Sequence, residues 1–185
     1  MKYNSLQVFI CVVFILTNAS CTKTQDVLPS ETHVGSNTIG FKVNGKVYTA
    51  SGNLRQLLSF GYVDYNTEQI DSSIFIKAAN TTGDNKFEIW LSIKYRDTVG
   101  AYLLTDGSYK GTFFLGGNPS PDDPSGSNIY YTNVLYTGTV TIKYFDGKFT
   151  PYNDGTILSG TFEMDGENKS GTIIHVTEGR FDIGN

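Results

Sequence analysis

Short apolar stretches separated by polar turns restrict the fold of this chain more than any other feature. From residue 38 onward they recur at intervals of about 8–15 residues. The stretch 86–95, KFEIWLSIKY, alternates between apolar and polar positions, with Trp90 as the exception on the polar face, and a period of two is typical of a strand with one buried face. One face would carry Phe87, Ile89, Leu91, Ile93 and Tyr95, and the other Glu88, Trp90, Ser92 and Lys94.

The dipeptide Asn44-Gly45 predicts a β-hairpin between the stretches 38–43 and 46–50. A two-residue turn of this kind needs φ > 0 at both positions, which Asn and Gly tolerate best. The register then places Val43 opposite Lys46, Phe41 opposite Tyr48 and Ile39 opposite Ala50. One face of the hairpin is therefore mostly apolar, as expected for a half-buried pair.

The composition agrees with an all-β protein. The chain has 20 Gly, 12 Tyr and 12 Phe, and few stretches rich in helix-forming residues. We expect a single antiparallel β-sandwich or flattened barrel of about ten short strands, formed by residues 38–185. Besides the hairpin, the expected strands are 54–63 (alternatively a short helix), 72–79, 86–95, 101–104, 109–115, 129–136, 138–145, 156–164, 171–177 and 180–183. The loop 116–128 holds three of the five prolines and cannot lie inside a sheet.

Residues 1–20, MKYNSLQVFICVVFILTNAS, have the features of a signal peptide. Lys2 provides a positive start, and an apolar run of about eleven residues ends at Leu16. That run is too short to span a membrane comfortably, which takes about 20 residues. The small residues Ala19 and Ser20 then precede Cys21, and this ending resembles the bacterial lipoprotein signal, in which the cysteine is lipidated and becomes the new N-terminus.

Cysteine usage agrees with lipidation of Cys21. Cys11 would leave with the signal, so the mature chain would hold one cysteine and no intramolecular disulfide. More than one acyl chain on Cys21 makes a stable anchor. Two alternatives are an ordinary secretory signal with an incidental thiol and an uncleaved N-terminal anchor helix. In the lipoprotein interpretation, residues 21–37 form the lipidated cysteine and a flexible tether.

Charge narrows the range of partners. The formal charge is −4, and removal of residues 1–20 takes away one Lys and no acid, which leaves −5. An acidic chain without a basic run excludes nucleic acid as the expected partner. The expected partners are the membrane, through the N-terminal lipid, and an unidentified glycan or protein. We expect a monomer.

No catalytic or metal-binding motif appears. The only histidines, His33 and His175, lie far apart, and no cysteine pair accompanies them. There is no G-x-S-x-G motif, and no carboxylate pair is picked out; Glu88 and Glu163 are interpreted as solvated strand residues. The sequence therefore predicts no enzyme activity and no cofactor.

Exposed aromatic residues are the better candidates for ligand contact. Trp90 lies on the polar face of its strand, where it would either stack on a sugar or partner, or meet a second sheet or a loop. Tyr130 and Tyr131, near the Pro-rich loop, are weaker candidates, since most aromatics of this chain are expected in the core. The tripeptide Asp97-Thr98-Val99 resembles an O-glycosylation acceptor, which makes Thr98 a candidate site.

Two blocks resemble a family of small Bacteroidota lipoproteins of unknown function. The block 32–48, THVGSNTIGFKVNGKVY, is similar to the family's opening T-x-x-G-x-N-T…V-N-G-K-V. LSGTFEM (158–164) and VTEGRFDIGN (176–185) are similar to its closing blocks, although Phe41 and Glu178 depart from the usual residues. The resemblance implies an envelope lipoprotein and no particular activity; Arg180 and Asp182 are expected to form a structural ion pair.

The sequence thus predicts a lipid-anchored, non-catalytic binding or interaction module of the outer membrane, on its periplasmic or its surface face. An alternative is a lipocalin-like carrier of a small apolar ligand, which needs a cavity inside a barrel. A further alternative is a glycan-active hydrolase, which needs two acids in one cleft.

Overall fold

A computed structural model describes residues 27–52, 61–68, 73–81, 85–94, 99–105, 110–116, 128–146 and 157–184. The expected signal peptide, Cys21, Thr98 and most of the Pro-rich loop lie outside the described residues.

Every regular element in the described part of the chain is a β-strand, and every pairing is antiparallel. The prediction of an all-β fold is confirmed. The strands are β1 (Thr38–Val43), β2 (Lys46–Ser51), β3 (Gly61–Glu68), β4 (Ser73–Asn80), β5 (Phe87–Lys94), β6 (Gly100–Leu104), β7 (Gly111–Leu115), β8 (Ile129–Tyr131), β9 (Gly138–Asp146), β10 (Ile157–Glu167) and β11 (Ile173–Gly184).

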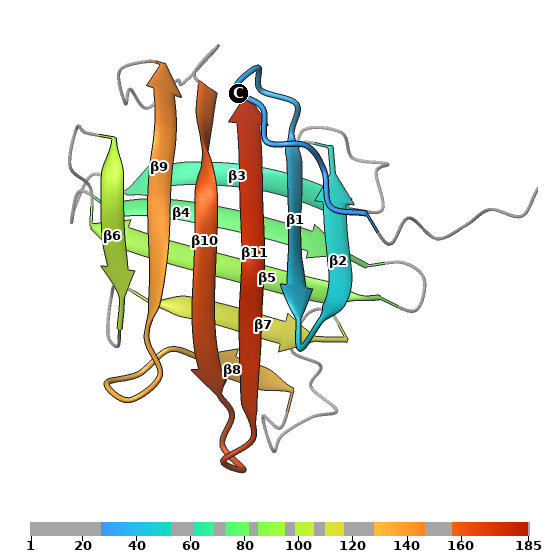
Figure 1. The fold of residues 1–185 in the computed structure, drawn as a ribbon, viewed down its shortest axis with the longest axis vertical. Coiled ribbons are helices and arrows are strands. Elements are labelled where there is room, and N and C mark those ends of the chain that lie inside the picture. The colour runs from blue at the N-terminus through green and yellow to red at the C-terminus, as the bar shows by residue number, and fades with distance from the viewer. Residues whose placement is uncertain are drawn as a thin grey trace, which may run out of the picture.

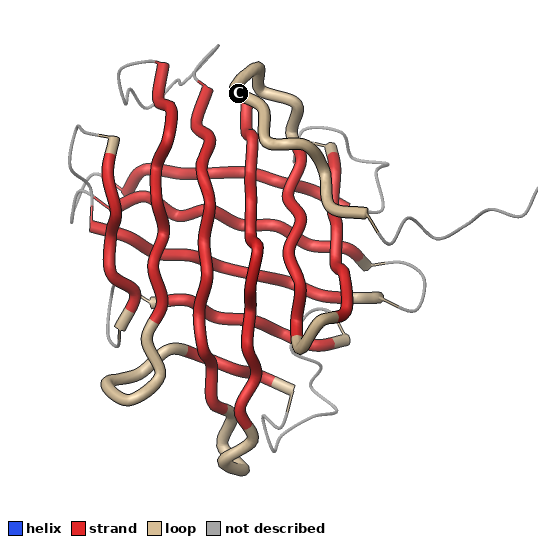
Figure 2. The backbone as a smooth tube through the Cα atoms, viewed as in Figure 1, coloured by secondary structure: helices blue, strands red, loops and turns tan. Residues whose placement is uncertain are grey.

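The strands form two layers that cross each other (Figures 1 and 2). The front layer has the order β2-β1-β11-β10-β9-β6, and the back layer has the order β8-β7-β5-β4-β3. One bridge between Glu167 of β10 and Tyr131 of β8 joins them into one sheet. Side chains of Asn80 and Asn85 donate to the carbonyls of Thr49 and Val47 (3.3 and 3.5 Å), so they occupy part of the β2 edge. The result is a flattened barrel.

The β1–β2 hairpin has the predicted register. Asn44 and Gly45 have φ of 49° and 85°, the left-handed conformation that this turn needs. The turn is also tied to β11, because the Asn44 side-chain oxygen accepts the N–H of His175 (2.9 Å).

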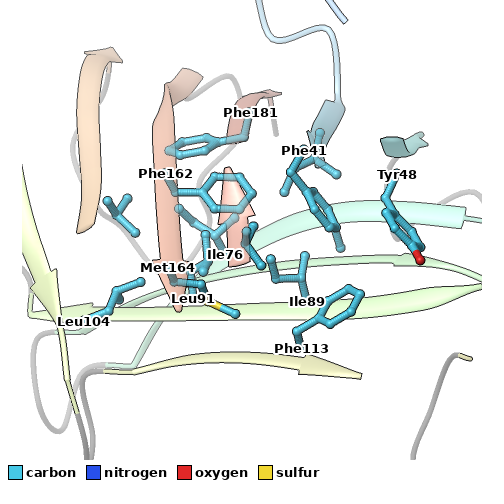
Figure 3. Close-up of a cluster of buried hydrophobic side chains, with 14 of the residues drawn as sticks. Phe41, Tyr48, Ile76, Ile89, Leu91, Leu104, Phe113, Phe162, Met164 and Phe181 are labelled. Atoms are coloured by element: carbon cyan, nitrogen blue, oxygen red, sulfur yellow. The ribbon is translucent and has the colours of Figure 1, made fainter. Parts of the chain in front are cut away.

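An aromatic cluster fills the space between the two layers (Figure 3). Phe41 of β1 lies at its centre, with ring centroids 5.0–5.8 Å from those of Tyr48, Phe87, Phe113 and Phe162. Aliphatic side chains of β4, β5, β9, β10 and β11 surround these rings. Both layers bury one face here, which is why their strands alternate between apolar and polar residues.

Three expected strand boundaries are wrong. The stretch 54–63 was expected to be a strand or a short helix, but β3 spans Gly61–Glu68 and overlaps it only at residues 61–63; residues 54–60 lie outside the described residues. The stretch 129–136 was expected to be one strand, but β8 ends at Tyr131. Asn133 ends it, since its side-chain oxygen accepts the N–H groups of Leu135 and Tyr136 (2.8 and 2.9 Å) and closes a turn. Conversely, 171–177 and 180–183 belong to the single strand β11.

Residues 29–37, which we call the N-terminal strap, pack against the folded sheet. The flexible tether predicted for 21–37 is therefore wrong for this part. The Asp182 carboxylate of β11 accepts hydrogen bonds from the Thr32 hydroxyl (2.5 Å) and from the N–H groups of Val34, Gly35 and Ser36 (3.2, 2.9 and 3.2 Å). The polar sequence of the strap predicts a solvated linker, because the sequence does not show which residue accepts its hydrogen bonds. Only the fold brings Asp182 beside the strap.

A methyl group at Gly160 should destabilise the front layer. Its Cβ would lie 2.0 Å from the Thr141 carbonyl oxygen, where β9 and β10 shift register. Because that oxygen is backbone, a strand must move, and we expect Gly160→Ala to lower the free energy of unfolding by about 2–3 kcal/mol in urea denaturation. Gly100→Ala, with no atom within 4 Å of its Cβ, is the control and should change it by less than about 0.5 kcal/mol. Equal stability of the two variants would contradict this packing.

Candidate functional site

The outer face of β9, β10 and β11 carries a groove of about 380 Å³. It lies on the side of the front layer that faces away from the core, and the strap reaches it through Glu31. Its lining is mostly polar, with hydroxyls and carboxylates from three adjacent strands. The lining residues are Glu31, Thr139, Thr141, Thr161, Phe162, Glu163, Glu178, Gly179 and Arg180.

Strand register arranges these side chains in two rows. Thr139 of β9 lies opposite Glu163 of β10, which gives one row. Thr141, Thr161 and Arg180 are paired across β9, β10 and β11, which gives the next. Directly paired side chains are about 5 Å apart, and the rows are about 7 Å apart along a strand. The groove therefore presents a regular, nearly flat array of polar groups.

A β-bulge brings Glu178 into this array. The β10–β11 register shifts between Phe162 and Met164, and Glu178 has φ of 52°. Gly179 follows with its Cα against Phe162, so close that a Cβ there would lie 2.5 Å from the Phe162 carbonyl oxygen. The extra residue directs Glu178 to the outer face, next to the groove.

Two ion pairs border the groove. Lys42 lies 2.5 Å from the Glu178 carboxylate, and Lys143 lies 2.6 Å from that of Glu31. The hydrogen bond from Lys143 holds the pKa of the Glu31 carboxyl below its usual value. Both pairs are substantially exposed, so each contributes little to stability. Their effect on the groove is to neutralise two of its carboxylates.

Arg180 lies between the groove and the strap. Its Nη1 donates to the Pro29 carbonyl (3.2 Å), while its buried Nε has no hydrogen-bond partner. A polar cavity of about 10 Å³ lies next to it, roughly the room that one water needs. The expected ion pair between Arg180 and Asp182 is wrong, because Asp182 bonds to the strap instead.

Trp90 lies on the outer face of the back layer, 36% exposed. Its indole N–H donates to Glu88 (2.6 Å), the Lys77 ammonium lies 5.1 Å from the ring centroid, and the Phe114 ring lies 5.3 Å away. No second sheet covers this face in the described part of the chain. Trp90 is thus partly packed and partly exposed, between the two alternatives that the sequence left open.

The two candidate tyrosines, Tyr130 and Tyr131, lie in different environments. Tyr130 is 7% exposed and packs in the core, with its ring 6.5 Å from that of Phe113, so it is wrong as a ligand-contact candidate. Tyr131 is half-buried on β8. Neither lines the groove.

The ionisable residues singled out in the sequence lie in different environments. His33 of the strap bonds to the Ser159 hydroxyl (2.5 Å), and exposed His175 bonds to Asp165 (2.8 Å). Glu88 is buried, so its interpretation as a solvated strand residue is wrong. Glu163 is exposed, as expected, but it lies in the groove.

Sequence reasoning missed the groove because its residues come from three strands and the strap.

Within the described ranges, no three His, Cys, Asp or Glu side chains gather as metal ligands would. The same ranges include no helix long and apolar enough to cross a membrane. Protein-family models, curated proteins and solved structures were all searched, and none matches this chain.

Proposed function

We propose that this chain is an envelope lipoprotein, anchored through Cys21, whose β domain is a non-catalytic binding module. The groove on β9–β11 is its ligand surface. The N-terminal features described above support the anchor, and the family resemblance agrees with them.

The single observation that carries the binding role is the placement of polar groups on an open outer surface. Aromatic side chains occupy the space between the layers. A ligand of this domain therefore binds outside the barrel, which disfavours the lipocalin-like carrier. The groove provides hydroxyls, a guanidinium and carboxylates on adjacent, rigid strands, and such surfaces position ligands better than loops do.

A glycan-active hydrolase is the second candidate, because three carboxylates line the groove. Such an enzyme needs one acid to give a proton and another to act as base or nucleophile. Glu31 and Glu178 are each paired with a lysine, which leaves Glu163 as the one groove carboxylate without an ion pair among the described residues. Release of reducing ends from neutral oligosaccharides by the purified protein would favour the hydrolase over the binding module.

Cys21→Ala should abolish lipidation. In a Gram-negative envelope preparation, we expect the parent chain to begin at Cys21 and to carry diacylglycerol and acyl mass by intact mass spectrometry. The variant should lack this added mass and leave the membrane fraction, because each buried CH₂ that is lost removes about 0.8 kcal/mol of membrane affinity. A parent chain that is unmodified and water-soluble would refute the anchor, whatever the groove binds.

A further inference from the structure

We propose that the groove on β9–β11 binds a neutral, polyhydroxylated ligand, a glycan chain without charged sugars. This inference rests on the proposed binding function and specifies its ligand class.

Charge balance argues for a neutral ligand. The groove and its bordering ion pairs contain three carboxylates, from Glu31, Glu163 and Glu178, and three cations, from Lys42, Lys143 and Arg180. An anionic ligand would meet the carboxylates, and a cationic ligand would meet Arg180. A ligand without net charge avoids both repulsions and needs no separation of the two existing ion pairs.

The hydrogen-bonding groups match sugar hydroxyls. Thr139, Thr141 and Thr161 each offer a hydroxyl that donates and accepts, as a sugar hydroxyl does. The Glu163 carboxylate accepts from ligand O–H groups, and Arg180 donates to ligand oxygens; hydrogen bonds to charged groups are the stronger ones.

The spacing of the array matches a chain of sugar rings. Rows about 7 Å apart, with neighbours about 5 Å apart within a row, place polar groups along two directions of a flat surface. A pyranose ring presents hydroxyls around its edge over comparable distances. An extended peptide matches less well, because the groove lies on a sheet face, whereas a peptide strand pairs with backbone at a sheet edge.

The test uses the chain from residue 22 onward, which contains every described residue, and amide chemical shifts in NMR titrations. The probes are neutral hexasaccharides of glucose, mannose, xylose and galactose, with hexagalacturonate and a glucosamine hexamer as charged comparisons. We expect at least one neutral probe to shift amides of residues 139–141, 161–163 and 178–180 saturably, with a dissociation constant of about 1 mM or tighter.

Two groove variants and one matched control sharpen the result. Glu163→Gln and Thr161→Val should each weaken the affinity about five- to tenfold, the usual effect of losing one hydrogen-bonding group. Thr49→Val on β2, outside the groove, should leave the affinity within about twofold. The amide spectrum of each free variant reports whether it is folded, so that loss of affinity is separated from loss of structure.

Several results would overturn the inference. Binding of only the charged probes in the groove would refute the neutral ligand class, although the groove would remain a binding surface and the proposed function would stand. The groove would be refuted as the ligand surface if no probe shifted a groove amide at 20 mM. Shifts centred on Trp90 would also refute it. If Thr161→Val and Thr49→Val weakened the affinity equally, the groove would likewise be refuted as the ligand surface.

Discussion

Phe41→Ala is expected to lower the free energy of unfolding by about 3–5 kcal/mol. Phe41 is fully buried, and its ring meets four other aromatic rings, contributed by both layers. Truncation removes apolar contacts from β1, β2, β5, β7 and β10 at once, and it leaves a cavity that these strands cannot close without moving. For a domain of this size, that is a large share of the total stability, so partial unfolding at 37 °C is expected as well.

Urea denaturation followed by tryptophan fluorescence measures this effect, since Trp90 is the single tryptophan of the chain. Phe41→Leu, which keeps most of the buried volume, should lose less than about 1.5 kcal/mol. Leu135→Ala is the surface control, because Leu135 is 79% exposed, and it should change stability by less than about 0.5 kcal/mol. If Phe41→Ala were no worse than Leu135→Ala, the aromatic cluster would not be the core.

Asp182→Asn is expected to destabilise the domain by about 2–3 kcal/mol at pH 7 and to release the strap. Both oxygens of the buried Asp182 carboxylate accept hydrogen bonds, from Gly35 on one oxygen and from Thr32, Val34 and Ser36 on the other. An amide replaces one acceptor by an NH₂ group that faces these donors. Each buried donor that is left without an acceptor lowers the stability of the fold by up to about 1–3 kcal/mol. Relaxation of the strap reduces this loss.

The loss of stability in Asp182→Asn should become smaller as the pH falls. Burial opposes ionisation of Asp182, but the hydrogen bonds from Thr32 and from the strap N–H groups outweigh it and hold the pKa below the ordinary value of 3.8. A lowered pKa in the folded state gives stability that is present in full above about pH 4 and is lost as the pH falls through the folded-state pKa. The stability difference between the parent and Asp182→Asn should therefore shrink below about pH 4.

Hydrogen exchange tests where the loss occurs. In Asp182→Asn, the amides of Val34, Gly35 and Ser36 should exchange faster, while core amides such as that of Leu91 should lose only the protection that global destabilisation explains. Denaturation from pH 7 to pH 3 gives the pH dependence, with Glu163→Gln as the control, because Glu163 is an exposed carboxylate on β10 without an ion pair among the described residues. A constant difference between the parent and Asp182→Asn over this range would mean that the strap does not lower the pKa of the Asp182 carboxyl.

Local sequence determined the class of fold. The alternation in β5, the Asn44-Gly45 turn and the register of β1 with β2 follow from side-chain period and turn chemistry, which act between residues close in sequence. The same reasoning placed β9 nearly as observed. It failed where a single polar residue acts through its side chain, as Asn133 does in ending β8.

Only the tertiary structure decided which strands and segments became neighbours. The strap looks like a linker until Asp182, about 150 positions later in the sequence, is seen to accept its hydrogen bonds. The groove exists because β9, β10 and β11 pair in one register and because a bulge turns Glu178 outward. Periodicity says which residues share a face of one strand. It carries no information about which strands become neighbours, because that choice depends on how the whole core packs.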